Sequence, residues 1–245
     1  MNALPALQTQ LWDGWVLRFS GGYTNRANSV NLLYPSALPF EEKIPFCERI
    51  YTAQGLPTVF KITDAAPIGL DAHLAARGYE IVTPTRVFTC TAPPTGEYHS
   101  DVIITKGMGA AWREAYFRLN KTDPRMIPTA SAMMDNIKGN SLCAKIVMEG
   151  KTIACGMCVE ERGYAGLYDI VVDPAHRRRG LACMLCKSLL IEAAENGANA
   201  FYLQVVANNA PAIALYEKLG FAPGYSYHYR VLKGEPHDHP RHDTR

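Results

Sequence analysis

The chain has 245 residues, of which 48% are hydrophobic and 20% are charged. This balance is typical of a globular protein with one large domain or two modest ones, and it excludes a disordered, collagenous or coiled-coil chain. The formal net charge is only +2, so no overall field recruits nucleic acid or anionic lipid. No apolar run reaches the roughly 20 residues that cross a bilayer, and the first residues lack the features of a secretory signal. We therefore expect a cytoplasmic protein without a nucleic-acid or membrane partner.

The first 90 residues predict strands alternating with helices. Strands are expected at 15–19, 28–35, 57–63 and 80–90, and helices at 41–54 and 70–77. The following stretch, TAPPTGEYHS at 91–100, has the proline and glycine content of a linker. We therefore divide the chain into an N-terminal half, residues 1–96, and a second domain, residues 97–234.

The second domain predicts two helices, then three strands, then an alternation of helix and strand. Helices are expected at 109–120, 131–137, 181–196 and 210–219, with a loop at 122–128, and strands at 141–149, 152–161, 164–172, 200–206 and 225–232. The tail at 235–245 is polar and rich in histidine, and we expect it to be flexible.

Two cysteine pairs have the spacing of metal ligands, Cys155 with Cys158 and Cys183 with Cys186. The first pair lies in a predicted strand, where residues three apart point to opposite faces. The second pair lies on the apolar side of a predicted helix. We interpret all four as small buried hydrophobic residues and expect no metal, with a zinc site as the alternative. Seven cysteines, an odd and sparse set, indicate a reducing compartment.

The segment VVDPAHRRRGLACMLCKSLL is the most informative part of the sequence. Its predicted strand ends at Asp173, and a short basic turn leads to Gly180, where a helix begins. The first turn of a helix has unpaired N–H groups and a partial positive charge, and a glycine lets a diphosphate approach the backbone. Arg177, Arg178 and Arg179 add positive charge. The pattern predicts a phosphate site, with an ordinary basic turn as the alternative.

This turn and a later segment together resemble one known family. Residues Arg177 to Ala182 fit the Q/R-x-x-G-x-G/A acyl-CoA motif of the GNAT N-acetyltransferase superfamily, and Asn209 to Phe221 resembles its N-x-x-A-x-x-L-Y-x-x-x-G-F segment. The resemblance covers Ser100 to about Leu232. It implies an α/β fold of the α+β type, with a mixed, mostly antiparallel central sheet flanked by helices. It also implies an enzyme that moves an acetyl group from acetyl-CoA to a primary amine by direct attack in a ternary complex.

The resemblance assigns residues to the co-substrate, acetyl-CoA. The turn and first helical residues would hold its pyrophosphate: Arg177, Arg178, Arg179, Gly180, Leu181, Ala182 and Cys183. The exposed edge of the strand at Ile170, Val171 and Val172 would pair with the pantetheine arm like an added strand. In the family this strand splays from its neighbour, here 200–206, and the cofactor enters the gap. Asn209 is an expected helix N-cap, a position that in the family also touches the pantetheine arm.

Two residues are candidate catalysts under this resemblance. Tyr216 is the expected general acid and also contacts the cofactor, because a phenol with a pKa near 10 stays protonated while a thiol titrates near 8.5. Its alternative role is packing. Asp169 is the expected base, acting on the amine through water, with a strand-edge hydrogen bond or an anchor for the amine as alternatives. Glu160 and Glu161 lie at a predicted hairpin end and are expected to be solvated.

The N-terminal half resembles a degenerate second copy of the C-terminal one. An offset of 142 residues aligns Gly78 with Gly220 and gives the same order of helix, glycine, aromatic residue and strand. At this offset Tyr216 aligns with Leu74, and no Arg-x-x-Gly-x-Ala follows Tyr34-Pro35. We expect this copy to be catalytically silent, with chance similarity as the alternative. The polar, glycine-rich run at 18–28 is either a loop that reaches the acceptor site or a plain hairpin.

Two functions remain open at this stage. The first is an acetyl-CoA-dependent N-acyltransferase, and the second is a non-catalytic GNAT-fold protein that senses acyl-CoA or another ligand. The sequence contains both the phosphate turn and Tyr216, and this pairing favours the enzyme, since a sensor needs no general acid. The acceptor would be a small amine, an amino acid or a peptide, in a pocket that draws on residues 119–136. The sequence leaves the acyl chain length open, and also whether the protein forms a homodimer.

Overall fold

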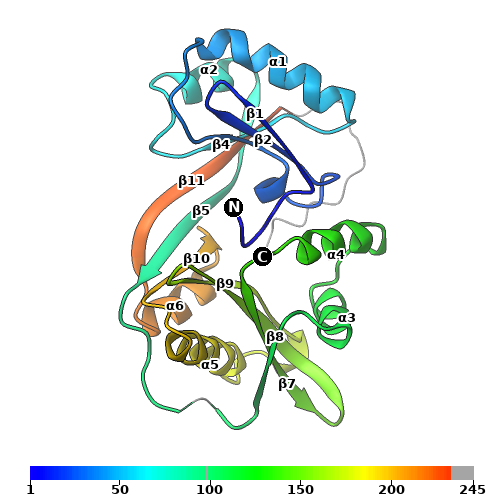
Figure 1. Ribbon diagram of the computed structural model, residues 1–245, viewed down its shortest axis with the longest axis vertical. Helices are drawn as coiled ribbons and strands as arrows, with labels where there is room; N and C mark the ends of the chain where they lie inside the picture. The colour runs from blue at the N-terminus through cyan, green and yellow to red at the C-terminus, as the bar shows by residue number, and fades with distance from the viewer. Residues whose placement is uncertain (98, 233–245) are drawn as a thin grey trace.

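The computed structural model describes residues 1–97 and 99–232, and their strands form one continuous 11-stranded sheet (Figure 1). The strand order is β1-β2-β3-β4-β11-β5-β10-β9-β8-β7-β6. Only the β3–β4 and β9–β10 pairs of these strands are parallel. The predicted fold class, a mixed and mostly antiparallel sheet flanked by helices, is confirmed. The tail at 235–245 lies outside the described residues.

The elements have the following bounds. The N-terminal half contains β1 (Gln8–Trp12), β2 (Trp15–Phe19), the short 3-10 helix η1 (Asn25–Ala27), β3 (Val30–Leu32), α1 (Phe40–Ala53), β4 (Val59–Ile62), α2 (Leu70–Ala76) and β5 (Tyr79–Cys90). The C-terminal half contains β6 (Val102–Lys106), α3 (Ala110–Leu119), η2 (Pro124–Met126), α4 (Ile127–Asp135), β7 (Asn140–Met148), β8 (Lys151–Glu161), β9 (Tyr164–Val172), η3 (Pro174–His176), α5 (Leu181–Glu195), β10 (Ala200–Val206), α6 (Ala210–Lys218) and β11 (Ala222–Leu232). Sequence reasoning missed β1 and β6, the two edge strands. It also placed the start of α4 too late, because Pro128 lies in the first turn, where a proline needs no hydrogen bond.

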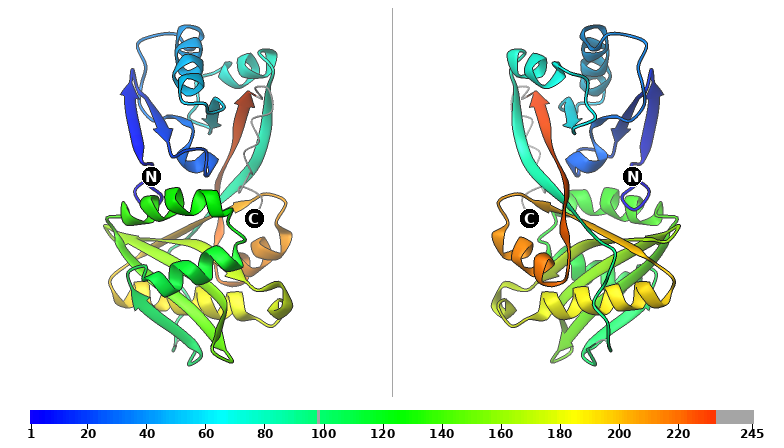
Figure 2. Two further views of the ribbon diagram at one scale, coloured as in Figure 1. Left: turned by 90° about the vertical axis from the view of Figure 1, so that its right-hand side faces the viewer. Right: turned by 90° about the vertical axis from the view of Figure 1, so that its left-hand side faces the viewer.

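The helices cover both faces of the sheet (Figure 2). In the C-terminal half, α5 and α6 pack on one face and α3 and α4 on the other, so two separate cores flank β7, β8 and β9. The prediction that Cys155 and Cys158 face opposite ways is confirmed, since each belongs to a different core. In the N-terminal half, α1 and α2 cover a third core around Phe60 and Leu74.

Strands β5 and β11 each extend into the other half of the sheet. They lie side by side and antiparallel, from the Thr89–Ala222 pair to the Tyr79–Leu232 pair, and they form the long connection between the halves in Figure 1. The outer edge of β11 pairs with β4, and the outer edge of β5 pairs with β10. Because each half therefore contains a strand from the other, separating the halves requires breaking the sheet.

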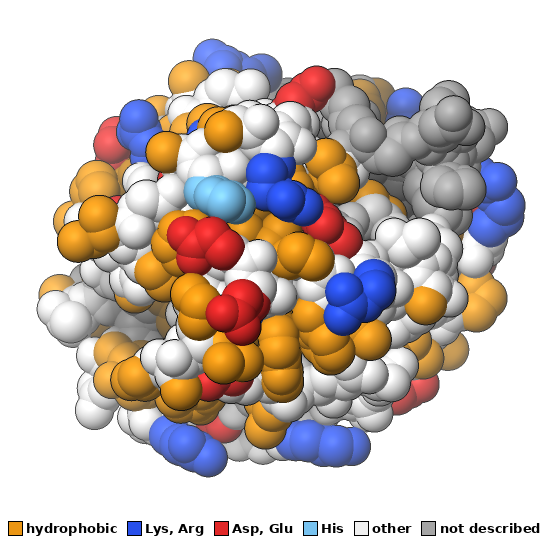
Figure 3. All heavy atoms as spheres, turned by 90° about the horizontal axis from the view of Figure 1, so that it is seen from above, with side chains coloured by type: hydrophobic (Ala, Val, Ile, Leu, Met, Phe, Trp, Pro, Cys, Tyr) orange, Lys and Arg blue, Asp and Glu red, His pale blue; other side chains and the backbone are white. Residues whose placement is uncertain are grey.

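Charged and apolar side chains are mixed on one face of the N-terminal half (Figure 3). On the face that Figure 3 shows, basic and acidic side chains are interspersed with apolar ones. No helix within residues 1–97 and 99–232 is both long enough and apolar enough to span a membrane.

An ion pair ties α2 to the exchanged strand β11. The Asp71 carboxylate accepts hydrogen bonds from Nε of Arg230 at 2.8 Å and from a terminal nitrogen of the same guanidinium at 3.1 Å. Nε2 of His228 lies 2.9 Å from the same carboxylate. Arg230 also donates to the carbonyl of Tyr79 at 3.0 Å, and so joins β11 to β5. These hydrogen bonds lower the pKa of Asp71 from 3.8 to about 2, and the bonds from Arg230 contribute most to this shift.

We predict that Asp71→Asn destabilises the protein in a pH-dependent way. Because the folded-state pKa of this carboxyl is depressed, its contribution is complete above pH 4 and is lost as the pH falls toward 2. Its side chain is 42% exposed, so we expect a loss of only about 0.5–1 kcal/mol in the free energy of unfolding at pH 7. Denaturant unfolding at pH 7, 4 and 3 measures this loss, with Asp64→Asn at an exposed site as the control. An equal loss at all three pH values would contradict the assignment.

Candidate active site

The parallel strands β9 and β10 separate partway along their length. They pair from Tyr164–Ala200 to Leu167–Leu203, and beyond that point no further pairing joins them in the described part of the chain. Strand β9 continues to Val172, paired only with β8, while β10 continues alongside β5. The edge of β9 that carries Ile170, Val171 and Val172 therefore faces a gap between the strands. This is the edge that the sequence assigns to the pantetheine arm.

A β-bulge at Asp169 bends β9 away from β10. The β8–β9 register shifts here, so Asp169 and Ile170 together lie opposite Gly156. Asp169 has a φ of +54°, a left-handed conformation that few residues other than glycine adopt. A Cβ on Gly156 would lie 2.4 Å from Cδ1 of Ile170, so a larger residue opposite the bulge would displace the end of the Ile170 side chain. The bulge thus opens the gap and places Asp169 beside it.

The partly buried Asp169 side chain has polar neighbours from both halves. Tyr116 of α3 donates a hydrogen bond to Oδ1 of Asp169 at 3.1 Å, and Asn120 donates to the Tyr116 phenol at 3.4 Å. Burial raises the pKa of Asp169, while the charge of Arg26 and the bond from Tyr116 oppose this rise. A carboxylate with a raised pKa is a better base than one in water.

Two of these neighbours were not predicted individually. Tyr116 stacks on Trp112 at 5.5 Å and belongs to the core under α3, so its periodicity indicates packing alone. Arg26 lies in η1, inside the polar run at 18–28 that the sequence singled out. Tyr23 of the same run packs in the same core as Tyr116. The structure therefore brings this N-terminal loop to Asp169.

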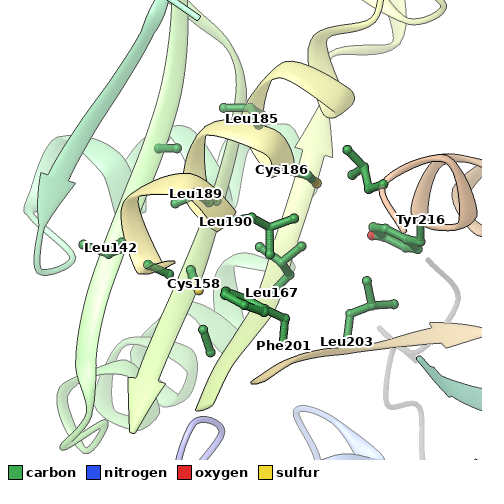
Figure 4. Close-up of a cluster of buried hydrophobic side chains, with 14 of the residues drawn as sticks. Leu142, Cys158, Leu167, Leu185, Cys186, Leu189, Leu190, Phe201, Leu203 and Tyr216 are labelled. Carbon is green, nitrogen blue, oxygen red and sulfur yellow. The ribbon is translucent and has the colours of Figure 1, made fainter. Parts of the chain in front are cut away.

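Tyr216 packs in one core with Leu167 and Leu203, the last residues that pair before β9 and β10 separate. Its side chain projects from α6 into the core that also contains Cys186 and Leu203, and it is only 9% exposed (Figure 4). Its phenol oxygen points away from α6 toward α5 (Figure 4). Burial raises the pKa of Tyr216 above its usual value of 10, so the phenol keeps its proton at neutral pH. Asn209 begins this helix as predicted, because its Oδ1 accepts a hydrogen bond from the amide of Ala212 at 3.3 Å.

The basic turn leads into an uncapped helix. Gly180 is the N-cap of α5 with a φ of +78° and provides no capping side chain, so the first amides of α5 at Leu181, Ala182 and Cys183 have no side-chain cap. A Cβ built on Gly180 meets nothing within 4 Å, which leaves the approach to this backbone open. The preceding Arg177, Arg178 and Arg179 are exposed, and none forms an ion pair with another described residue. The geometry suits a diphosphate.

One expectation about the acidic residues is wrong. Glu160 was expected to be solvated, but it is only 9% exposed, and Asn196 at the end of α5 donates a hydrogen bond to it at 3.0 Å. Both residues line a cavity of about 530 Å³ at the end of α5 opposite to Gly180. None of the predicted catalytic or cofactor-binding residues lines this cavity, but Met134 and Asp135, from the segment 119–136 that was expected to contribute to the acceptor pocket, do. Within the described ranges, no three His, Cys, Asp or Glu side chains gather as a metal site would require.

Comparisons with known proteins find relatives along almost the whole chain. The family model described as "Probable histone acetyltransferase Rv0428c C-terminal" matches residues 1–230. The "Uncharacterized N-acetyltransferase YobR" of Bacillus subtilis is 30% identical over 235 residues, 94% of each chain. A ribosomal protein bS18-alanine N-acetyltransferase of Salmonella typhimurium is 51% identical over 57 residues, which are 23% of this chain and 38% of the relative. A solved "GCN5-related N-acetyltransferase from Kribbella flavida" superposes with a TM-score of 0.68 at 16% identity, over 94% of this chain and 90% of its own.

We predict that Gly180→Val weakens the binding of coenzyme A at least tenfold, about 1.4 kcal/mol, because the side chain fills the approach to the α5 amides. Isothermal calorimetry measures the affinity. Gly197→Val is the matched control, since Gly197 follows the other end of α5, also has a positive φ, and also has nothing within 4 Å of its Cβ. Equal affinities of the two variants would contradict the assignment of the turn.

Proposed function

The chain belongs to the GNAT N-acetyltransferase family, and from this premise we propose that it transfers the acetyl group of acetyl-CoA directly to a primary amine. The observation that carries the proposal is the gap between β9 and β10. The basic turn lies at its outer end, Asp169 is beside it on β9, and Tyr216 is beside it on α6. A direct transfer requires these parts: a grip on the cofactor, a base for the amine and an acid for the leaving thiolate.

The cofactor grip follows from main-chain groups. The amides at the start of α5 and the charges of Arg177, Arg178 and Arg179 would hold the diphosphate. The unpaired edge of β9 from Ile170 to Val172 would hydrogen-bond the pantetheine amides as an added strand. Bound acetyl-CoA supplies the thioester that the amine attacks.

Asp169 is the proposed base. An alkyl ammonium has a pKa near 10.4 and must lose its proton before it attacks. The burial that raises the pKa of Asp169 makes the carboxylate a stronger proton acceptor, and Tyr116 holds its orientation through Oδ1. Oδ1 is therefore the oxygen used for positioning, which leaves Oδ2 for the amine or a bridging water.

Tyr216 is the proposed acid. Its buried phenol remains protonated at neutral pH, so it can donate to the sulfur while the C–S bond breaks. Because a thiol with a pKa near 8.5 is the stronger acid, the tyrosinate then recovers a proton from the attacking nitrogen, which must lose its extra proton as the amide forms. The surrounding core, which includes Cys186 and Leu203, shields the phenol from water.

We also propose that the N-terminal half is a degenerate copy without a cofactor site. The offset of 142 residues aligns α1 with α5, β4 with β10 and α2 with α6. The pairing of β5 with β11 is irregular at two places, near Thr83 of β5 and near Gly224 of β11. The offset aligns these two positions to within one residue. The first turn of α1 carries Glu41 and Glu42 where a diphosphate would bind, and Leu74 takes the place of Tyr216. This half therefore lacks both the anion grip and the acid.

We predict that Tyr216→Phe lowers turnover by about 10²–10⁴ while the affinity for acetyl-CoA changes little, because the ring stays packed and only the hydroxyl is lost. The loss should appear equally in kcat and kcat/KM. Steady-state kinetics with an amine acceptor and calorimetry with acetyl-CoA measure the two quantities. Leu74→Met, at the aligned position of the N-terminal half, is the control and should leave the kinetics unchanged. Full turnover by Tyr216→Phe would make this tyrosine a packing residue.

We predict that Asp169→Asn loses about 10²-fold in kcat/KM at pH 7, and that this deficit shrinks as the pH rises toward 9.5. At high pH more of the acceptor is already neutral and needs no base. Asparagine also accepts a positive φ, so the bulge is kept. A pH profile of the ratio between wild type and variant measures the effect. A ratio that does not change with pH would mean that Asp169 anchors the amine and does not deprotonate it.

A further inference from the structure

Lys61 of β4 points toward the junction of the two halves. Its neighbours Phe60 and Ile62 pack in the core under α1 and α2, so alternation turns Lys61 to the opposite face of the sheet. There it lies opposite Tyr229 of the neighbouring strand β11, and its ammonium is 3.9 Å from the centre of the Tyr227 ring.

Lys61 has no counter-ion among residues 1–97 and 99–232. In the described part of the chain no carboxylate lies within ion-pair distance of Lys61, and its ammonium donates no hydrogen bond. Lys43, the fully buried lysine of this half, has Asp13 at 3.0 Å. Burial and the charges of Arg18 and Arg26 lower the pKa of Lys61 to about 8. A desolvated cation among other cations costs stability, and such a cost is typical of a binding site.

Arg26 connects this region to the active site. It lines a small cavity between the halves together with Thr85 of β5, Gln204 of β10, and Tyr227 and Tyr229 of β11. The same guanidinium is close enough to Asp169 to oppose the rise of its pKa. Arg26 therefore carries a positive charge close to both Lys61 and the proposed base, Asp169.

The loop that carries Arg26 is held in place. The buried Arg18 donates hydrogen bonds to the backbone carbonyls of Arg26 and Leu4. The Asn28 amide oxygen accepts from the backbone of Ser20 at 2.7 Å and of Gly22 at 3.0 Å. These bonds fix the backbone of the loop from which the Arg26 side chain extends.

The cavity has a volume of about 30 Å³. A single water requires about 10–15 Å³ on the same measure, so the space matches two oxygen atoms and does not admit a folded chain. Its walls contain hydroxyl and amide groups together with the guanidinium of Arg26. Lys61 does not line the cavity itself, but its ammonium lies 3.9 Å from the ring centre of Tyr227, which does. A carboxylate has the size of this cavity and a charge opposite to that of both cations.

We propose that the acceptor is a small molecule with both an amino group and a carboxylate, which Lys61 and Arg26 bind while the amino group faces Asp169. The inference rests on the proposed function and specifies its substrate class. In this account the N-terminal half has no cofactor of its own but selects the acceptor for the C-terminal half. Binding the carboxylate also supplies the counter-ion that Lys61 lacks.

The test is acetyl transfer to a panel of paired acceptors. The panel contains amino acids with the amino group α, β or γ to the carboxylate, the carboxamide of each, a diamine and a short peptide. For wild type we expect at least one amino carboxylate to exceed its carboxamide tenfold or more in kcat/KM. In Lys61→Met we expect this preference to fall to twofold or less, mainly through KM for the carboxylate, and Lys61→Arg should retain most of it. Lys151→Met, at an exposed site on β8, is the matched control and should keep the full preference.

Thermal unfolding separates a binding role from a structural one. If Lys61 serves the acceptor, Lys61→Met removes an uncompensated charge, and its Tm without ligand should equal or exceed that of wild type. A lowered Tm together with an unchanged carboxylate preference would make Lys61 a structural residue.

Several outcomes overturn the inference but leave the proposed function intact. These are equal use of acid and carboxamide, a preference that survives Lys61→Met, or transfer to the diamine or peptide alone. Failure of transfer to every acceptor also overturns the inference, and if acetyl-CoA fails to bind as well, the proposed function fails with it.

Discussion

The antiparallel pairing of β5 with β11 determines how the rest of the molecule is arranged. Each strand begins in its own half and is flanked on its outer edge by a strand of the other half, which makes the sheet continuous. The pairing of β5 with β10 has a second consequence. It occupies one edge of β10 along the segment that leaves β9, so the gap between β9 and β10 is fixed by hydrogen bonds on both sides. The same exchange brings Thr85 of β5, Gln204 of β10 and Tyr227 of β11 to one cavity with Arg26.

The local parts of this arrangement could be predicted from the sequence. Helix α5 was expected at 181–196 and runs from Leu181 to Glu195, and α6 was expected at 210–219 and runs from Ala210 to Lys218. Both helices begin at residues whose preference is local: Gly180 with a positive φ, and Asn209 with a capping side chain. Strand β10 matches its predicted bounds, and its residues alternate between partly buried and buried.

The long-range parts could not be predicted in this way. Nothing in the residues of β5 or β11 indicates that they exchange places, because strand order depends on contacts between distant segments. The bulge at Asp169 forms opposite Gly156 in another strand, and Glu160 is buried where the end of α5 contacts it. In the pattern PTVFKIT, Lys61 has the spacing of a solvent-facing residue. Only the fold shows that this face of β4 lies against Tyr227 and near Arg26.

The number of acetyl-CoA molecules bound per chain tests the central claim, that the C-terminal half alone retains a cofactor site. We expect calorimetric titration to give one site per chain, with that site weakened by Gly180→Val. A stoichiometry of two, or one site of unchanged affinity in Gly180→Val, would contradict this claim.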